Sequence, residues 1–303
     1  TGRVDGVGRA EFAYLRRVVE ERASIVLEDD KEYLVSSRLR PVLRDAGLPS
    51  LAALVSTLRR DPGSALADRV VDAMTTNETS FFRDLHPFEV LSAEIVPSLL
   101  AERPASAPIT VWSAACSSGQ EPYSLAITLL EHVPQLDPAR VRIVATDLSP
   151  TMVERCRAGR YSQLEINRGM PARLLVRYFE QDGDEWVVRP EVRSLVEVHE
   201  LNLTGRWDVV PRCDVVLMRN VLIYFGHVTR REVLRRVRTE VLHPGGHLML
   251  GAGETTLNVD EAWLRHTVGR VTCYRAPGSE GRPRPSDEPG PPGRGLRHER
   301  KEP

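Results

Sequence analysis

The sequence predicts an α/β fold with a doubly wound, mainly parallel sheet, a small all-α N-terminal domain and a small β insertion. Three observations lead to this fold class. From about Phe88 onward, helical patterns and short apolar runs alternate, as they do in doubly wound sheets. Residues 9–72 contain several helical patterns and almost no strand pattern. Between Ala158 and Arg193 the alternation stops, which indicates an inserted subdomain.

Length and composition set the domain organisation. The 303 residues exceed the usual span of one domain, and we place domains at 1–76 and 77–276, an insertion at about 158–193 and a disordered Pro/Gly/Arg-rich tail at 277–303. The formal net charge of −1 gives no indication of a nucleic-acid partner. No apolar run approaches the ~18 residues that cross a bilayer, and no signal-peptide core is evident. We therefore expect a cytoplasmic protein without direct membrane insertion. We take a monomer as the default oligomeric state.

The N-terminal domain is predicted from apolar residues at helical spacing. One such stretch begins at Phe12 and another at Leu51. Residues 61–63 (Asp, Pro, Gly) interrupt the second pattern, and Ser64 is placed to cap a last helix over Ala65–Met74. The helical domain thus ends just before a polar segment.

The stretch from Val111 to Ser124 predicts a strand, a tight loop and the start of a helix. The apolar run stops at small residues, and Pro122 opens a helical pattern. Unpaired backbone amides at such a turn, together with the helix dipole, favour a polar, partly anionic ligand. Gly119 is the only glycine of the loop and no Lys follows it, so neither a phosphate loop nor a dinucleotide loop is present. The loop suits a nucleotide-like cofactor that lacks a pyrophosphate.

Polar side chains follow the other predicted strands of the parallel sheet. These strands are Val141–Asp147, Leu195–Leu201 and Asp214–Met218. Asp147 ends the first, Asn202 follows the second, and Asn220 follows the third after one residue. Open α/β sheets bind ligands outside the carboxyl ends of their strands, and a strand-end acid is typical of ribose recognition. We expect Gly119, Asp147, Asn202 and Asn220 along one edge.

The remaining elements close the fold. The sequence predicts a basic amphipathic helix over Arg230–Leu242, a turn at His243–Gly246, a strand over His247–Gly251 and a last strand near Val271–Tyr274. Within the insertion it predicts a helix over Pro171–Tyr178 and a hairpin with Gly183 at its turn and residues 186–188 beyond.

The cysteines and histidines give no sign of a metal site. Cys116, Cys156, Cys213 and Cys273 are widely separated, without a CxxC pair, and none of the eight histidines has zinc-ligand spacing. We expect small buried thiols, structural histidines and no bound metal.

Four segments in this order resemble the chemotaxis receptor methyltransferase family, CheR. They are NETSFFRD at 77–84, SAACSSGQEPYS at 113–124, ATDLSP at 145–150 and RNVLIYF at 219–225, and the resemblance spans about residues 10–276. It implies a class I, Rossmann-like methyltransferase fold. It also implies methyl transfer from S-adenosylmethionine, leaving S-adenosylhomocysteine, to glutamate side chains on the cytoplasmic helices of chemoreceptors, which gives glutamate methyl esters.

The resemblance also implies roles for residues in these segments. Around the cofactor it places Asn77, Thr79, Arg83, Gly119, Glu121, Asp147, Asn202, Leu203, Arg219 and Asn220. Asp147 would hold the ribose, Glu121 the methionine amino group, and Arg83 the methionine carboxylate in a fork geometry. The structural alternatives are a helix start, a solvated acid, an interdomain capping segment and ordinary strand ends.

For residues facing the acceptor, the resemblance implies Tyr224, whereas Arg103 is placed by its position before the first strand and the docking arginines by their helical pattern. Tyr224 would lie near the methyl group and orient the acceptor, although the run VLIYF also suits a buried core; Arg103 is a weaker candidate for a cation facing the substrate. Arg38, Arg40, Arg44, Arg59 and Arg60 could form a basic docking face for an acidic receptor helix, or a solvated charged face. In some members of the family the β insertion grips a tether peptide at the receptor C-terminus; the hairpin here is short, so we do not expect that function from it.

A glutamate with a pKa of about 4.3 is ionised at neutral pH, so methyl-ester formation needs alignment and desolvation rather than a general base. The absence of a Cys/His or Ser/His/Asp pattern agrees with this chemistry. Two alternatives stay open: a methyltransferase for a small molecule or nucleic acid, and a regulatory module that senses the cofactor without turnover.

Overall fold

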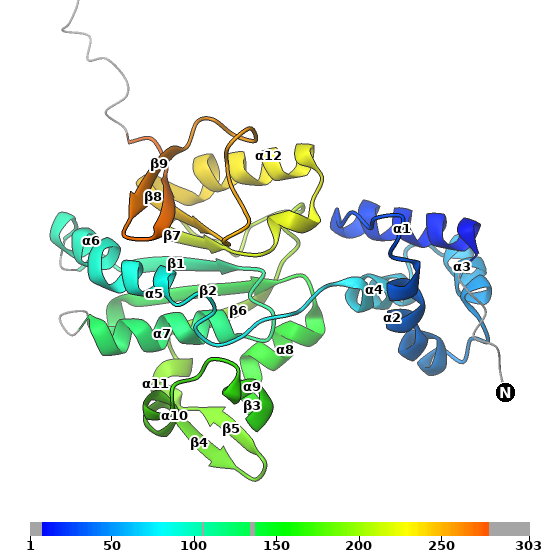
Figure 1. Ribbon diagram of the computed structural model, residues 1–303, viewed down its shortest axis with the longest axis horizontal. Coiled ribbons are helices and arrows are strands. Elements are labelled where there is room, and N and C mark those ends of the chain that lie inside the picture. Colours follow the sequence, from blue (N-terminus) through cyan, green and yellow to red (C-terminus); the bar gives the residue numbers. More distant parts are fainter. Residues whose placement is uncertain (1–7, 105, 134–136, 279–303) are drawn as a thin grey trace, which may run out of the picture.

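The computed structural model describes residues 8–104, 106–133 and 137–278. An all-helical N-terminal domain, on the right of Figure 1, lies beside a larger α/β domain, and the segment that follows Met74 connects them. The predicted tail lies outside the described residues from residue 279 onward.

The N-terminal domain consists of four helices around a core of its own. They are α1 (Arg9–Ala23), α2 (Glu32–Asp45), α3 (Leu51–Arg60) and α4 (Ala65–Met74). Leu15, Leu39 and Leu58 are fully buried at its centre. The helix predicted over Ala65–Met74 is confirmed, whereas the Ser64 hydroxyl donates to the Asp61 carbonyl at 2.9 Å instead of capping the helix.

A seven-stranded sheet in the order β6-β2-β1-β7-β8-β10-β9 forms the centre of the second domain. Its strands are β1 (Ile109–Ala114), β2 (Val141–Asp147), β6 (Val196–Glu200), β7 (Cys213–Met218), β8 (Leu242–Leu250), β9 (Leu264–Val268) and β10 (Val271–Arg275). All neighbours from β6 to β8 pair in parallel, and β10 pairs antiparallel with β8 and with β9. The doubly wound, mainly parallel sheet is thus confirmed.

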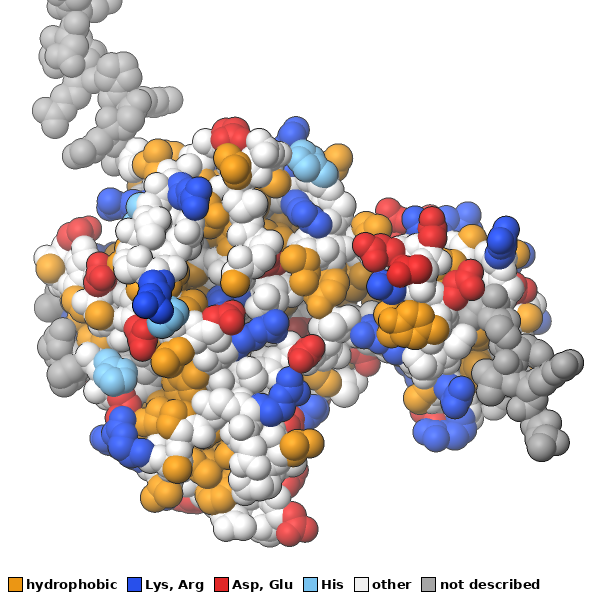
Figure 2. Space-filling model, in the orientation of Figure 1, with side chains coloured by type: hydrophobic (Ala, Val, Ile, Leu, Met, Phe, Trp, Pro, Cys, Tyr) orange, Lys and Arg blue, Asp and Glu red, His pale blue; other side chains and the backbone are white. Residues whose placement is uncertain are grey.

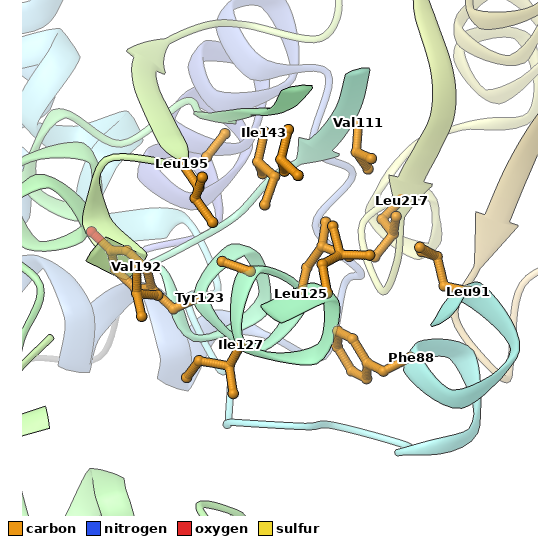
Figure 3. Close-up of a cluster of buried hydrophobic side chains, with 14 of the residues drawn as sticks. Phe88, Leu91, Val111, Tyr123, Leu125, Ile127, Ile143, Val192, Leu195 and Leu217 are labelled. Atoms are coloured by element: carbon orange, nitrogen blue, oxygen red, sulfur yellow. The ribbon is translucent and has the colours of Figure 1, made fainter. Parts of the chain in front are cut away.

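Helices cover both faces of this sheet. They are α5 (His86–Val90), η1 (Leu91–Ile95), α6 (Val96–Glu102), α7 (Gln120–His132), η2 (Pro138–Arg140), α8 (Pro150–Ala158), η3 (Leu222–Tyr224), α12 (His227–Arg236) and η4 (Val237–Val241). On one face, Leu125 of α7 packs between Leu217 of the sheet and Phe88 of α5 (Figure 3). On the other face, Leu234 of α12 joins Trp112 of β1 in a second buried layer. From β1 the strand order runs outward in one direction to β2 and β6 and in the other direction to β7 and β8. Doubly wound folds bind ligands at such a switch point, here between β1 and β7.

The insertion forms a separate three-stranded antiparallel sheet beneath α7 and α8 in Figure 1. It contains β3 (Arg160–Ser162), α9 (Gln163–Asn167), α10 (Ala172–Tyr178), β4 (Phe179–Asp182), β5 (Glu185–Val188) and α11 (Pro190–Arg193). The predicted helix and the hairpin around Gly183 are confirmed, and β3 is an additional strand. Glu131 of α7 ties the insertion to the domain because it accepts the Tyr178 hydroxyl at 2.7 Å.

Three predictions near the C-terminus were incomplete or wrong. The predicted turn at His243–Gly246 is part of β8, where a register shift against β7 accommodates the glycines. The helix predicted to reach Leu242 changes to π-helical turns after Arg236. The edge strand β9 was not predicted, because most of its side chains are polar and exposed and give no apolar run.

The two domains touch through backbone and side-chain hydrogen bonds. Val26 N donates to the Tyr224 carbonyl at 2.9 Å, and the Asn202 amide donates to the Arg22 carbonyl at 2.7 Å. On the face drawn in Figure 2, acidic and basic side chains are interspersed over both domains. Among the described residues, no helix has both the length and the apolar character needed to cross a membrane.

Candidate functional site

A cleft of about 890 Å³ opens at the carboxyl ends of β1, β2 and β7, where the helical domain meets the sheet. Its lining comes from the end of α1 (Ala23, Ile25), the interdomain segment (Thr75–Thr79, Arg83) and the loop after β1 (Ala115–Ser117, with Glu121). It is completed by the residues after β2 (Asp147, Leu148), β6 (Leu201–Leu203) and β7 (Arg219–Val221, Tyr224, Phe225). Nine of the ten residues predicted around a cofactor line this one cleft.

Asp147 is the buried acid of the cleft, with 7% of its surface exposed. Its Oδ2 accepts a hydrogen bond from Ser117 N at 2.7 Å, and its Oδ1 accepts one from Ser149 N at 2.9 Å. Burial raises the pKa of Asp147, and these backbone donors oppose that shift. Each carboxylate oxygen can accept a second hydrogen bond, so Asp147 keeps capacity for a pair of ligand hydroxyls.

Arg219 holds together three segments at the floor of the cleft. Its side chain is 1% exposed. Nη1 donates to Glu121 Oε2 at 2.9 Å, and Nη2 donates to Asp84 Oδ2 and to the Arg83 carbonyl, both at 2.8 Å. Ser113 Oγ donates to the other oxygen of Glu121 at 2.8 Å. Because two carboxylates share one buried guanidinium, the cluster keeps a net negative charge beside the cleft.

The interdomain segment supplies Asn77, Thr79 and Arg83. Ser117 Oγ donates to the Asn77 carbonyl at 2.9 Å, which joins this segment to the loop after β1. Buried Phe81 anchors the segment, since its side chain is 1% exposed. The Arg83 guanidinium donates to the Glu78 carbonyl at 3.2 Å and is half-buried in the cleft wall, so most of its five donors remain available.

Asn202 lies in the cleft wall, but its amide is used inside the protein. Its Nδ2 donates to the Arg22 carbonyl, and its Oδ1 accepts from Thr204 N at 2.9 Å and Thr204 Oγ1 at 2.8 Å. The adjacent Leu203 side chain is buried against the cleft. The apolar contact of Leu203 is therefore open to a ligand, whereas the Asn202 side chain serves the domain contact.

Asn220 and the turn that follows it are held by an acid that the sequence analysis missed, Glu254. Asn220 has a left-handed backbone, with φ of 59°. Glu254 Oε2 accepts from Asn220 N at 2.7 Å and from Gly251 N at 2.8 Å, and Oε1 accepts from Ile223 N at 3.3 Å. Glu254 is far from Asn220 along the chain and follows no recognisable spacing, so only the fold reveals this contact.

Gly119 is a correction to the predicted site because it does not line the cleft. It has φ of 98° and immediately precedes α7. A Cβ at this position would lie 2.7 Å from Cys156 Sγ and 2.9 Å from the Tyr161 hydroxyl. A glycine is therefore required here for packing against Cys156 and Tyr161.

Arg103 is a second correction. Its Nη2 lies 2.6 Å from Asp214 Oδ1, at the amino ends of the strands, and Asp214 Oδ2 accepts from Thr110 N at 2.9 Å. Because α6 leads into the beginning of β1, Arg103 lies at the edge of the sheet opposite the cleft. It therefore does not face a substrate in the cleft.

The predicted docking arginines divide into two groups. Arg38 is half-buried and donates to the Met74 carbonyl at 2.8 Å, the Thr75 carbonyl at 2.9 Å and Thr76 Oγ1 at 3.1 Å. It fixes the interdomain segment, so its guanidinium is already used within the protein. The other four, Arg40, Arg44, Arg59 and Arg60, are exposed on α2 and α3.

Comparison with known protein families accounts for both domains. Residues 10–75 match the all-alpha domain of the CheR methyltransferases, and residues 77–272 match their S-adenosylmethionine-binding domain. The chain belongs to the CheR methyltransferase family.

Relatives that carry the name chemotaxis protein methyltransferase align with this chain over nearly their whole length. Chemotaxis protein methyltransferase Cher2 of Pseudomonas putida is 42% identical over 252 residues, which cover 82% of this chain and 90% of that protein. Chemotaxis protein methyltransferase 1 of Pseudomonas aeruginosa is 42% identical over 272 residues, covering 88% of this chain and 98% of that protein. Chemotaxis protein methyltransferase of Vibrio parahaemolyticus is 42% identical over 249 residues, covering 81% and 89%.

This CheR chain is accordingly a methyltransferase, and its cofactor is S-adenosylmethionine. The residues of the cleft fit that molecule. Asp147 has spare acceptor capacity for hydroxyls, and Arg83 has spare donors for a carboxylate. The negative charge of the Arg219 cluster faces a space that suits an ammonium group and a sulfonium.

Proposed function

We propose that this CheR-family methyltransferase acts in chemotaxis, transferring the methyl group to glutamate side chains of chemoreceptors and giving methyl esters. The observation that carries the proposal is that each acidic residue of the described cleft lining is held by partners within the protein: Glu78 by Arg168, Glu121 by Arg219, and Asp147 by the backbone N–H groups of Ser117 and Ser149. No residue of the described lining is a histidine, and a hydrogen bond with Cys156, together with burial, raises the pKa of the Cys116 thiol. An alcohol or amine acceptor would need a base, whereas a glutamate is already ionised. The names of the relatives support a role in chemotaxis.

We assign the cofactor contacts from the free donors and acceptors of the cleft. Asp147 accepts the two ribose hydroxyls, Glu121 lies nearest the methionine ammonium, and Arg83 binds the methionine carboxylate. Leu203 packs on the adenine ring, and Asn220 contacts its edge. Asn77 and Thr79 complete the methionine end. Asn202 and Arg219 support this arrangement from behind.

S-adenosylmethionine supplies an electrophilic methyl group on a sulfonium. Tyr224, half-buried at the cleft wall, hydrogen-bonds one oxygen of the acceptor carboxylate and directs the other oxygen toward that carbon. The helical domain covers the cleft through Ala23 and Ile25 and excludes water from the acceptor. In a cleft without water, methyl transfer from the sulfonium to the carboxylate is favourable because the positive and the negative charge are both neutralised.

The partner we propose is the cytoplasmic helical region of a chemoreceptor, with the enzyme acting as a cytoplasmic monomer. Arg40, Arg44, Arg59 and Arg60 are exposed and can steer an acidic helix toward the cleft. Such rim charges mainly affect the association rate, so their contribution should weaken as salt increases.

Transfer of a labelled methyl group to a receptor cytoplasmic fragment tests the proposal. We expect incorporation that is released as methanol by mild base, as for an ester, and that disappears when the acceptor glutamates are changed to glutamine. Base-stable label, or label that persists in the glutamine variant, would exclude ester formation. Cofactor binding without any transfer would favour a sensor.

A further inference from the structure

We propose that the β insertion braces the cofactor cleft, and that Tyr161 and Gly169 are positioning residues for S-adenosylmethionine. The inference does not depend on which acceptor is methylated. The insertion touches, from behind, two of the segments that line the cleft: the loop after β1 and the interdomain segment 77–84.

The first contact fixes the loop after β1. Tyr161 of β3 is fully buried, and its hydroxyl donates to the Ser118 carbonyl at 2.7 Å. The preceding Ser117 lines the cleft and donates its backbone N–H to Asp147. Tyr161 thus holds the loop from the side opposite Asp147. The close approach of Gly119 to this hydroxyl leaves no room for the loop to retreat.

The second contact fixes the interdomain segment. Gly169, between α9 and α10, has φ of +107°, and a Cβ there would lie 2.1 Å from the Phe81 carbonyl oxygen. Next to it, Arg168 Nη2 lies 2.9 Å from Glu78 Oε1. The backbone at Gly169 lies directly against the backbone at Phe81. This contact sets the position of the segment that carries Asn77, Thr79 and Arg83.

One aromatic cluster joins the two contacts. The Phe81 ring meets Tyr161 edge to face at 4.9 Å between centroids and meets Phe179 at 5.6 Å. All three side chains are at most 2% exposed. Because close-packed aromatic side chains have little freedom to shift, the insertion and the two cleft segments form one rigid unit.

A pair of hydroxyl deletions separates positioning from general stability. Tyr161→Phe leaves the Ser118 carbonyl unpaired. Tyr123→Phe is the matched control, because Tyr123 is also buried and its hydroxyl donates at 2.8 Å to the carbonyl of Cys156, in α8, rather than to a residue of the loop after β1. We expect both variants to melt at lower temperature. Titration calorimetry should show about fivefold weaker binding of S-adenosylhomocysteine to Tyr161→Phe and unchanged binding to Tyr123→Phe.

A pair of glycine substitutions tests the second contact. Gly169→Ala should displace the Phe81 carbonyl and weaken binding of S-adenosylhomocysteine by at least the same factor. Gly183→Ala also introduces a side chain at positive φ, at 62°, but has nothing within 4 Å of its Cβ, so binding should be unchanged. If Gly169→Ala does not fold, the tyrosine pair still decides. Wild-type affinity in Tyr161→Phe, or equal losses in the two tyrosine variants, overturns the inference.

Discussion

An aspartate is buried at each end of the parallel strands, Asp214 at their amino ends (the amino edge) and Asp147 at their carboxyl ends (the carboxyl edge), and the two carboxylates have different hydrogen-bond partners. At the amino edge, Asp214 pairs with Arg103 and accepts a backbone N–H from Thr110. At the carboxyl edge, Asp147 accepts only backbone N–H groups, and none of the ion pairs among the described residues includes it. Both edges are hollowed, with a cleft of about 800 Å³ at the amino edge. A cleft alone therefore does not identify the ligand site. What identifies it is that Asp147, unlike Asp214, keeps hydrogen-bond acceptors that no other described residue uses.

The largest expected effect separates these two aspartates. Asp147→Asn should weaken S-adenosylhomocysteine binding by about 100-fold or more, because charge-assisted hydrogen bonds to two hydroxyls are lost. Asp214→Asn should lower the urea midpoint but keep cofactor affinity within about twofold. Calorimetry on both variants checks the difference. Normal affinity in Asp147→Asn would remove the ribose assignment.

A second comparison concerns the two arginines at the edges. Arg219→Ala should reduce the free energy of unfolding by about 3–5 kcal/mol, since it leaves the Glu121 carboxylate, whose side chain is 12% exposed, without its buried cation. Arg103→Ala should cost less because 23% of its side chain is exposed, and it should leave turnover unchanged. Urea unfolding and labelled-methyl transfer measure both properties. A large loss of turnover in Arg103→Ala would restore its proposed place near the substrate.

The third effect is confined to catalysis. Tyr224→Phe should bind S-adenosylhomocysteine normally and lower kcat about tenfold, because the lost hydroxyl orients only the acceptor. Measuring both kcat and S-adenosylhomocysteine affinity distinguishes this result from general damage to the cleft, which would weaken binding as well. Unchanged kcat would mean that Tyr224 is merely part of the wall.

The smallest effect is a pH dependence at the amino edge. Burial lowers the pKa of His247 from 6.5 to about 4, with His266 and Arg275 adding to the shift and Glu102 opposing it. Between these values the unfolded chain binds a proton that the folded chain does not, so stability should fall as pH drops from 6.5 toward 4. His247→Gln should flatten urea midpoints measured across this range without changing cofactor affinity. An unaltered pH profile would show that other groups dominate.

Much of the cleft was accessible from sequence because parallel strands end in register. Asp147, Asn220 and Arg219 each follow an apolar strand, so their proximity followed from the predicted topology. Gly119 was misassigned because the sequence cannot tell which side of a loop a missing Cβ faces. Arg103 was misassigned because the residue preceding a strand lies at the opposite edge. Glu254 was missed because two of its three partners, Asn220 and Ile223, lie more than 30 residues away along the chain.

The sequence by itself determined the order of helices and strands, the strand ends that carry polar groups and the membership in a methyltransferase family. Local periodicity and motif strings are properties of neighbouring residues, and they survive without knowledge of the fold. Only the tertiary structure decided which polar atoms remain free, because that depends on partners far away in the chain. It showed that Arg38 and Asn202 are used in contacts within the protein, whereas Asp147 keeps hydrogen-bond acceptors and Arg83 keeps hydrogen-bond donors that a ligand in the cleft can use.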